Sequence, residues 1–150
     1  MVTVNKNFVA SVFRTFDLNL DTLPNRIAFQ KTVFLLQKLG INSGYSFGWY
    51  SFGPYSSQLA KEGFSVEDND VSTALILEHP SVEKFKELKK DFEKDSKFLE
   101  LMADIVFLKS QLHIQDHQKI FQRIVQHRVY LNNYAKFKLA LERLSKAGLI

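Results

Sequence analysis

The chain contains no cysteine and, among its 150 residues, only one tryptophan and three prolines. Without cysteine it can form no disulfide, no thiolate metal site and no cysteine nucleophile. No apolar run reaches the roughly 18 residues that a membrane-spanning helix requires. The first segment, MVTVNKNFVASVFRTFDL, also lacks the basic start and the cleavage site of a secretory signal. We therefore expect a soluble, cytoplasmic protein that makes no membrane contact.

Aromatic side chains, in contrast, are abundant. The chain has fourteen phenylalanines, and its 45% hydrophobic and 24% charged residues are typical of a globular protein. A chain of this length is the size of one ordinary domain and buries roughly two-thirds of its extended surface on folding. Because the sequence has no internal repeat, no low-complexity segment and no domain boundary, we predict a single domain over residues 1–150 with a core of rigid rings.

Hydrophobic residues recur with the helical period along most of the chain. We predict a mainly α fold, a bundle of about six helices with a small β element, a hairpin or short strands, near residues 44–53. The main helices are expected at residues 6–17, 26–39, 79–92, 98–112, 116–128 and 133–147. Residues 65–71 are acidic and loop-like, and residues 72–77 fit either a short strand or a helical turn.

The second predicted helix has a broad apolar arc and stops at Gly40, with Asn25 placed to cap its start. Its opposite side is polar and contains Arg26, Gln30, Lys31, Gln37 and Lys38. Ile27 and Phe34 also fall within that polar side. They either meet a second packing layer or form an apolar spot on a polar surface.

The stretch FGWYSFGPYSSQL, residues 47–59, holds five aromatic rings, two glycines and one proline. Before Gly53 the aromatic residues alternate with a period of two, which indicates a strand. After Gly53 the period becomes helical, and Pro54 suits the first position of a helix that runs to Gly63. The stretch is therefore predicted to be a strand, a turn and a helix start.

Two kinds of catalytic loop are excluded for this stretch. A phosphate-binding loop needs lysine and a hydroxyl residue after its second glycine, where this chain has Pro54 and Tyr55. A nucleophile elbow has its two glycines four positions apart, whereas Gly48 and Gly53 are five apart.

Elsewhere, His113, Asp116 and His117 suggest a metal site, but a helix break near Gln115 favours exposed or capping histidines. We expect no enzymatic activity, no cofactor and no metal.

Basic residues are concentrated in the last quarter of the chain. Residues 113–150 hold seven lysine and arginine side chains against Asp116 and Glu142. This charge either belongs to a solvated helix surface or faces a phosphate backbone. The candidate nucleic-acid-binding residues are Lys119, Arg123, Arg128, Lys136, Lys138 and Arg143. The segment KFKLALERLSKAGLI also resembles the helix before a wing, so the alternative function is a transcriptional regulator with a winged-helix-like basic C-terminal region that binds nucleic acid.

The order of RIAFQKTVFLLQKLG and FGWYSFGPYSSQL resembles the YwgA-like uncharacterised family and the related Panacea (SocA-like) antitoxin domain. The likeness continues more weakly through LELMADIVFLK and KFKLALERLSKAGLI. It implies a compact, mainly helical domain that binds a protein partner, such as a toxin or a protease system, as an antitoxin or adaptor. The positions that match the family motifs, and that the resemblance makes candidate partner-binding residues, are Gln30, Lys31, Trp49, Tyr50, Gly53, Pro54, Tyr55 and Ser56.

Trp and Tyr side chains on a rigid turn are typical interface anchors, which gives these rings a second interpretation besides core packing. We expect core positions for Phe47, Trp49 and Tyr55, and surface contact for Tyr50 and Ser56.

Overall fold

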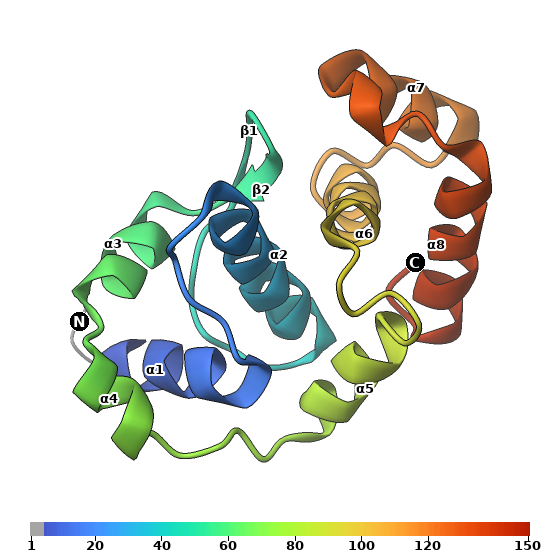
Figure 1. The fold of residues 1–150 in the computed structure, drawn as a ribbon. Coiled ribbons are helices and arrows are strands. Elements are labelled where there is room, and N and C mark those ends of the chain that lie inside the picture. The colour runs from blue at the N-terminus through green and yellow to red at the C-terminus, as the bar shows by residue number, and fades with distance from the viewer. Residues whose placement is uncertain (1–4) are drawn as a thin grey trace.

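The computed structural model describes residues 5–150 and is mainly helical, with one small β-hairpin (Figure 1). This confirms the predicted fold class. The helices are α1 (Asn5–Phe16), α2 (Leu23–Leu39), α3 (Ser57–Ser65), α4 (Asp68–Thr73), α5 (Pro80–Leu88), α6 (Ser96–Ser110), α7 (His117–His127) and α8 (Tyr134–Lys146). A short 3-10 helix, η2 (Val129–Leu131), joins α7 to α8. The described part thus contains more α-helices than the predicted six, because α3 and α4 are short separate helices.

Helices α2 and α6 pack against each other at the centre of the molecule. Figure 1 shows α1, α3 and α4 gathered on one side of this pair and α7 and α8 on the other. The hairpin contacts both central helices. Because neighbours surround them, α2 and α6 bury residues around most of their circumference, and the buried apolar side chains of all the layers form one continuous core.

Part of the polar side of α2 is buried in the structure. The helical periodicity of the sequence did not predict this burial for the polar residues Gln30 and Lys31. Phe34 is fully buried, with its ring centroid 5.1 Å from that of Phe47 and 6.2 Å from that of Phe107. This confirms the second packing layer for Phe34, whereas Ile27 is half-buried beside a pocket. Gln30 and Lys31, which belong to the predicted polar side, are also buried. The hairpin and the residue after it lie over the middle of this side and cover Gln30 and Lys31, whereas Arg26 and Lys38 nearer the ends of the helix stay exposed.

Helix α2 begins earlier than predicted. The hydroxyl of Thr22 accepts a hydrogen bond from the backbone N–H of Asn25 at 3.2 Å, so Thr22 is the cap and Asn25 lies inside the first turn. Pro24 fits that turn because its missing N–H would have no partner inside the helix there. The predicted end at Gly40 is confirmed, and its φ of +130° is open to glycine.

The hairpin consists of β1 (Gly48–Tyr50) and β2 (Gly53–Tyr55), paired antiparallel with Trp49 opposite Pro54. The prediction that Pro54 starts a helix is therefore wrong. A proline is tolerated in an edge strand, where its position needs no ladder donor. The helix starts later, at Ser57, because the Ser56 hydroxyl accepts from the N–H of Leu59 at 3.2 Å and provides the cap.

The connection from α3 to α5 contains one further correction. Residues 65–71 were expected to form a loop, but α4 begins at Asp68, with reciprocal capping between Glu67 and Asp70. Residues 74–78 have no regular structure, and α5 then begins at Pro80, as predicted, with His79 as its cap. Across residues 5–150, the helices are all too short or too polar to pass through a lipid bilayer.

Candidate partner-binding site

Two side chains of α2 form hydrogen bonds with the backbone of the hairpin and of the residue that follows it. Gln30 Nε2 donates to the carbonyl oxygen of Ser56 at 3.0 Å, and its Oε1 accepts from the Ser56 N–H at 2.9 Å. The amide thus pairs with Ser56 as a neighbouring strand would. Lys31 Nζ donates to the carbonyl oxygen of Pro54 at 2.7 Å. These buried bonds satisfy backbone groups that a two-stranded hairpin leaves unpaired.

A cluster of buried charges lies behind Gly53. Arg128 follows α7 directly, and its two terminal nitrogens form ion pairs with Glu100 and Asp104 of α6, all three side chains being buried. The Tyr130 hydroxyl donates to Glu100 Oε1 at 2.8 Å. We call Glu100, Asp104 and Arg128 the buried ion cluster, which Tyr130, itself exposed, borders. It connects α6, the end of α7 and the hairpin turn.

Gly53 is the point at which the hairpin meets the buried ion cluster. Its φ is +89°, a conformation that side chains rarely adopt. A β-carbon there would also lie inside van der Waals contact of Asp104 Oδ1 and 3.1 Å from Arg128 Nη2. Glycine is therefore required both by the backbone conformation and by the close approach of the carboxylate.

Burial changes the acidity of the groups behind the hairpin. Loss of water raises the pKa of Asp104 to about 7, although Arg128 and Lys31 act in the opposite direction. Loss of water also lowers the pKa of Lys31 to about 8, a shift that Asp104 reduces. Burial and the hydrogen bond to Glu100 raise the pKa of Tyr130 to about 12. Asp104 Oδ1 and Arg128 Nε have no hydrogen-bond partner in the part of the chain that is described.

The raised pKa of Asp104 predicts a pH-dependent stability. An unfolded aspartate has a pKa of about 4, so between about pH 4 and 7 the folded protein retains a proton that the unfolded chain releases. This stabilisation is fully present below about pH 4 and is lost as the pH rises through 7. The variant Asp104→Asn has no titrating group at this position.

We therefore expect the free energy of unfolding of the wild type, relative to Asp104→Asn, to fall by more than about 1.4 kcal/mol between pH 4 and 8, the equivalent of one pKa unit. Urea denaturation followed by circular dichroism at several pH values measures this difference. Parallel pH profiles for the two proteins would show that the Asp104 pKa is not raised.

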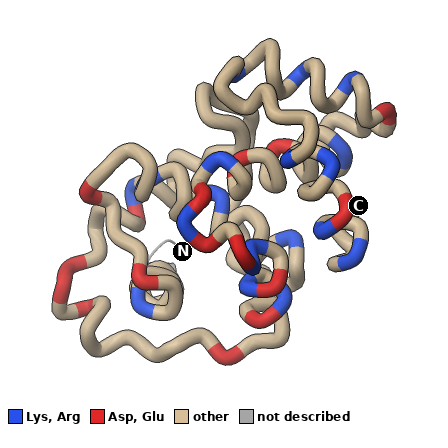
Figure 2. Tube along the Cα trace, turned by 45° about the vertical axis from the view of Figure 1, so that its right-hand side comes forward, with Lys and Arg blue, Asp and Glu red and all other residues tan. Residues whose placement is uncertain are grey.

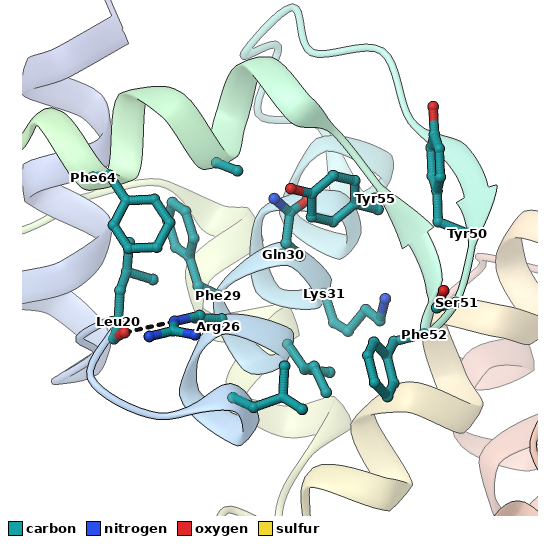
Figure 3. A pocket seen from close by; sticks show the side chains of 13 residues that line it. Leu20, Arg26, Phe29, Gln30, Lys31, Tyr50, Ser51, Phe52, Tyr55 and Phe64 are labelled. Carbon is teal, nitrogen blue, oxygen red and sulfur yellow. Dashed lines mark hydrogen bonds between the residues drawn. The ribbon is translucent and has the colours of Figure 1, made fainter.

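The front of the hairpin forms one wall of a cavity of about 390 Å³. Figure 3 shows it between the start of α2, the hairpin and α3. The lining residues are Leu20, Leu23, Arg26, Ile27, Phe29, Gln30, Lys31, Tyr50, Ser51, Phe52, Tyr55, Ala60 and Phe64. We call this cavity the ring pocket. Four of its large apolar side chains are exposed: Leu23 by 49%, Tyr50 by 55%, Tyr55 by 36% and Phe64 by 63%.

Trp49 faces the helices instead of the ring pocket. Its ring lies 5.6 Å from that of Phe107 and 5.1 Å from that of His127, measured between centroids, and Arg128 Cζ is 5.8 Å from its centre. His127 Nε2 is 2.6 Å from the carbonyl oxygen of Tyr50, which can only accept, so the histidine donates. Trp49 therefore helps to join the hairpin to α6 and α7.

The structure brings the motif residues together but gives them different surroundings. Gln30, Lys31, Gly53, Pro54 and Ser56 are buried and hold the hairpin in place. Trp49 is half-buried, while Tyr50 and Tyr55 are exposed and line the ring pocket. The expected positions of Phe47 in the core and Tyr50 on the surface are confirmed. The expectations for Tyr55 and Ser56 are wrong, because Gln30 draws the Ser56 backbone inward and the Tyr55 ring points outward.

The basic residues proposed for nucleic-acid contact do not share one surface role. Arg128 is buried in the ion cluster, and Lys136 pairs with Asp95. Arg143 bonds to the carbonyl oxygens of Leu88 and Lys90. Lys119, Arg123 and Lys138 are exposed. Figure 2 marks the charges along the chain.

The histidines suspected of metal binding lie at the junction of α6 and α7. The chain leaves α6 at Ser110 and enters α7 at His117, which confirms the predicted break between His113 and His117. Asp116 caps α7, and His117 Nε2 lies 3.0 Å from Lys109 Nζ. Among residues 5–150 no three histidine, aspartate or glutamate side chains are grouped so that they could hold a metal ion.

The buried ion cluster was not predicted from the sequence. Glu100 and Asp104 are spaced four apart within a helix that is otherwise apolar on nearly every side. Charged side chains in such a helix are almost never buried without a partner. That spacing was the available signal, and it predicts that a cation from elsewhere in the chain lies against α6.

Comparisons of the chain with models of protein families, with curated proteins and with solved structures give no match. The resemblance to the YwgA-like family and the Panacea domain therefore stays a prediction from the motif residues.

Proposed function

We propose that this protein is a non-enzymatic interaction module of the antitoxin or adaptor type, which binds a protein partner at the ring pocket. The observation that carries the proposal is the set of exposed rings around one cavity. Tyr50 and Tyr55 belong to the hairpin and Phe64 belongs to α3, and all three line the same cavity together with Leu23 of α2 (Figure 3). Exposed apolar groups that gather in this way mark interaction sites, whereas scattered ones do not.

The polar groups beneath the ring pocket support a contact function. Gln30 is fully engaged with Ser56, and Lys31 donates to Pro54. Their main effect is to fix the backbone that carries Tyr50 and Tyr55. Two rings on an anchored hairpin lose little conformational entropy when a partner covers them, which is the property of interface anchors. The buried motif residues thus position the exposed ones.

Site-specific photo-crosslinking tests this proposal. The photoreactive amino acid p-benzoylphenylalanine replaces Tyr50 in one variant and Phe64 in a second, and each variant is irradiated in native lysate. Lys138 of α8, which is also exposed, provides the control position. We expect the same discrete protein adduct from the first two positions and not from the third. An adduct of equal yield from all three positions, or from none, would contradict the proposal.

Nucleic-acid binding is a second candidate, supported by the charge of α7. This helix carries the exposed Lys119 and Arg123 and has no acidic residue between His117 and His127. Duplex DNA would bind with an affinity that falls steeply as salt rises, because phosphate contacts release counterions. The double variant Lys119→Gln, Arg123→Gln should then weaken binding and reduce the salt dependence. A mobility shift that is absent at low salt would rule this candidate out.

A further inference from the structure

Arg26 gives the ring pocket a fixed positive edge. It lies in the first turns of α2, and its Nε donates to the carbonyl oxygen of Leu20 at 2.8 Å. Its Cζ also lies 5.7 Å from the centre of the Phe64 ring, a cation–π distance. These two contacts hold the guanidinium plane at the pocket wall (Figure 3).

The outer edge of this guanidinium is open. Within residues 5–150, Arg26 forms no ion pair, and no hydrogen bond is made by its Nη1 or Nη2. A guanidinium offers its N–H donors in a rigid fork that matches the two oxygens of a carboxylate. Since Nε is already used, the pair of terminal nitrogens remains for such a contact.

No carboxylate balances this charge at the pocket. The lining residues within the described chain include the two cations Arg26 and Lys31 but neither aspartate nor glutamate. All the other lining side chains are neutral, and most are apolar. An occupant with a basic group would be repelled here, and a purely apolar one would leave the fork of Arg26 without an acceptor.

The size of the cavity limits its occupant. A volume of about 390 Å³ is near the lower end of the roughly 300–1,000 Å³ range of ligand pockets, so it has room for one large apolar side chain. Tyr50 and Phe64 extend apolar surface beyond the cavity onto the rim. A small molecule inside the cavity would leave this rim exposed, whereas a polypeptide would cover it.

We propose that the ring pocket receives a segment of the partner protein in which a large apolar residue, such as leucine or phenylalanine, is followed closely by aspartate or glutamate. The apolar side chain fills the cavity, and the carboxylate meets the terminal nitrogens of Arg26. This inference rests on the proposed function and specifies the chemistry of the partner at the same site.

Selection from a random-peptide library displayed on phage, with the intact protein as bait, tests the inference. We expect the enriched peptides to share a large apolar residue that is followed, one or two positions later, by an acidic residue. The most enriched peptide is then synthesised with a fluorescent label, and its dissociation constant is measured by anisotropy.

Matched variants locate the carboxylate. Arg26→Gln should weaken binding of this peptide by about tenfold, the value of one charge-assisted contact of about 1.4 kcal/mol. The dissociation constant for Arg26→Lys should lie between those of the wild type and Arg26→Gln, because lysine keeps the charge but lacks the forked pair of donors. Arg123→Gln removes an exposed cation from α7 and should change the affinity by less than about twofold, since it lies outside the lining of the pocket. Exchanging the acidic residue of the peptide for its amide should abolish the difference between the wild type and Arg26→Gln.

The remaining outcomes overturn the inference in distinguishable ways. Enriched peptides that are apolar without an acid, or that are basic, would refute the role of Arg26 while leaving a protein-binding pocket. Equal binding of the acidic peptide to the wild type and to Arg26→Gln would refute it as well. Binding of free 3-phenylpropionate as tight as that of the peptide would assign the pocket to a small molecule. A selection without enrichment would refute the peptide inference, while crosslinking at Tyr50 decides the proposed function independently.

Discussion

Replacing Gly53 with alanine is expected to lower the free energy of unfolding by about 3–5 kcal/mol, at the upper end of single-residue effects. Two costs combine at this position. The φ of +89° is unfavourable for any residue with a β-carbon. The new methyl group would also displace the carboxylate of Asp104 from its place beside Arg128. Valine at the same position should be worse, because its branched side chain is larger.

Gly44 provides the matched control for Gly53. Its φ is +80°, but a β-carbon there would meet no atom within 4 Å. Gly44→Ala should therefore show the backbone cost alone, about 1–2 kcal/mol. Urea denaturation followed by circular dichroism compares the two variants. If Gly53→Ala were no less stable than Gly44→Ala, the close approach of Asp104 would contribute nothing to stability.

The second large effect is expected for Arg128→Ala. This change leaves Glu100 and Asp104 buried without the guanidinium that pairs with both. Removing one partner of a buried ion pair costs about 3–5 kcal/mol, because each carboxyl that remains must either stay charged without a partner or take up a proton. Arg128→Lys should recover only part of the loss, since one ammonium cannot reproduce the two parallel contacts of the guanidinium fork.

Two comparisons separate the ion cluster from general effects of losing an arginine. Arg123→Ala removes an exposed arginine of α7 and should change stability by less than about 0.5 kcal/mol. Adding Asp104→Asn to Arg128→Ala should restore part of the lost stability, because it removes one of the two buried carboxyl groups that have lost their arginine partner. A result in which Arg128→Ala is as stable as Arg123→Ala would show that the cluster does not stabilise the fold.

The helices could be predicted from the sequence because most of them bury only one stripe. In α7, for example, Ile120 and Ile124 point inward while Lys119 and Arg123 remain in water. The sequence of such a helix shows which of its faces is turned toward the core. The sequence of α2 does not, because Gln30 and Lys31 are polar and yet buried. Their burial depends on the hairpin, which is distant in sequence and whose position is a tertiary property.

Residue preferences for local structure gave wrong predictions where two preferences applied to the same residue. Pro54 satisfies the preference for the first position of a helix, and it equally satisfies the needs of an edge strand. Ser56 decides between these two as the actual cap, supported by the bonds from Gln30 to its backbone. The capping of α2 by Thr22 in place of Asn25 has the same origin, since both residue types are good caps and only the path of the chain selects one.

Some residues of the candidate site could be predicted from the sequence motif, but their arrangement in space could not. The motif led to Tyr50 and Tyr55, which line the ring pocket. It did not lead to Phe64, which follows the segment FGWYSFGPYSSQL, or to Arg26, which begins the segment RIAFQKTVFLLQKLG but is not one of the positions that match the family motif. It also did not lead to Arg128, whose sequence position resembles that of a surface cation. The pairing of Arg128 with α6 follows from the packing of the last third of the chain, and no local pattern encodes that packing.

The position of Arg128 in the chain has a consequence for synthesis on the ribosome. Residues 48–55 emerge early, and Arg128 follows several seconds later at about 5–20 residues per second. A two-stranded hairpin is at best marginally stable by itself, and the carboxylates behind Gly53 lack their guanidinium until then. The nascent chain therefore completes its tyrosine-bearing surface late, so a partner of the ring pocket would meet the finished surface only after α7 has been made.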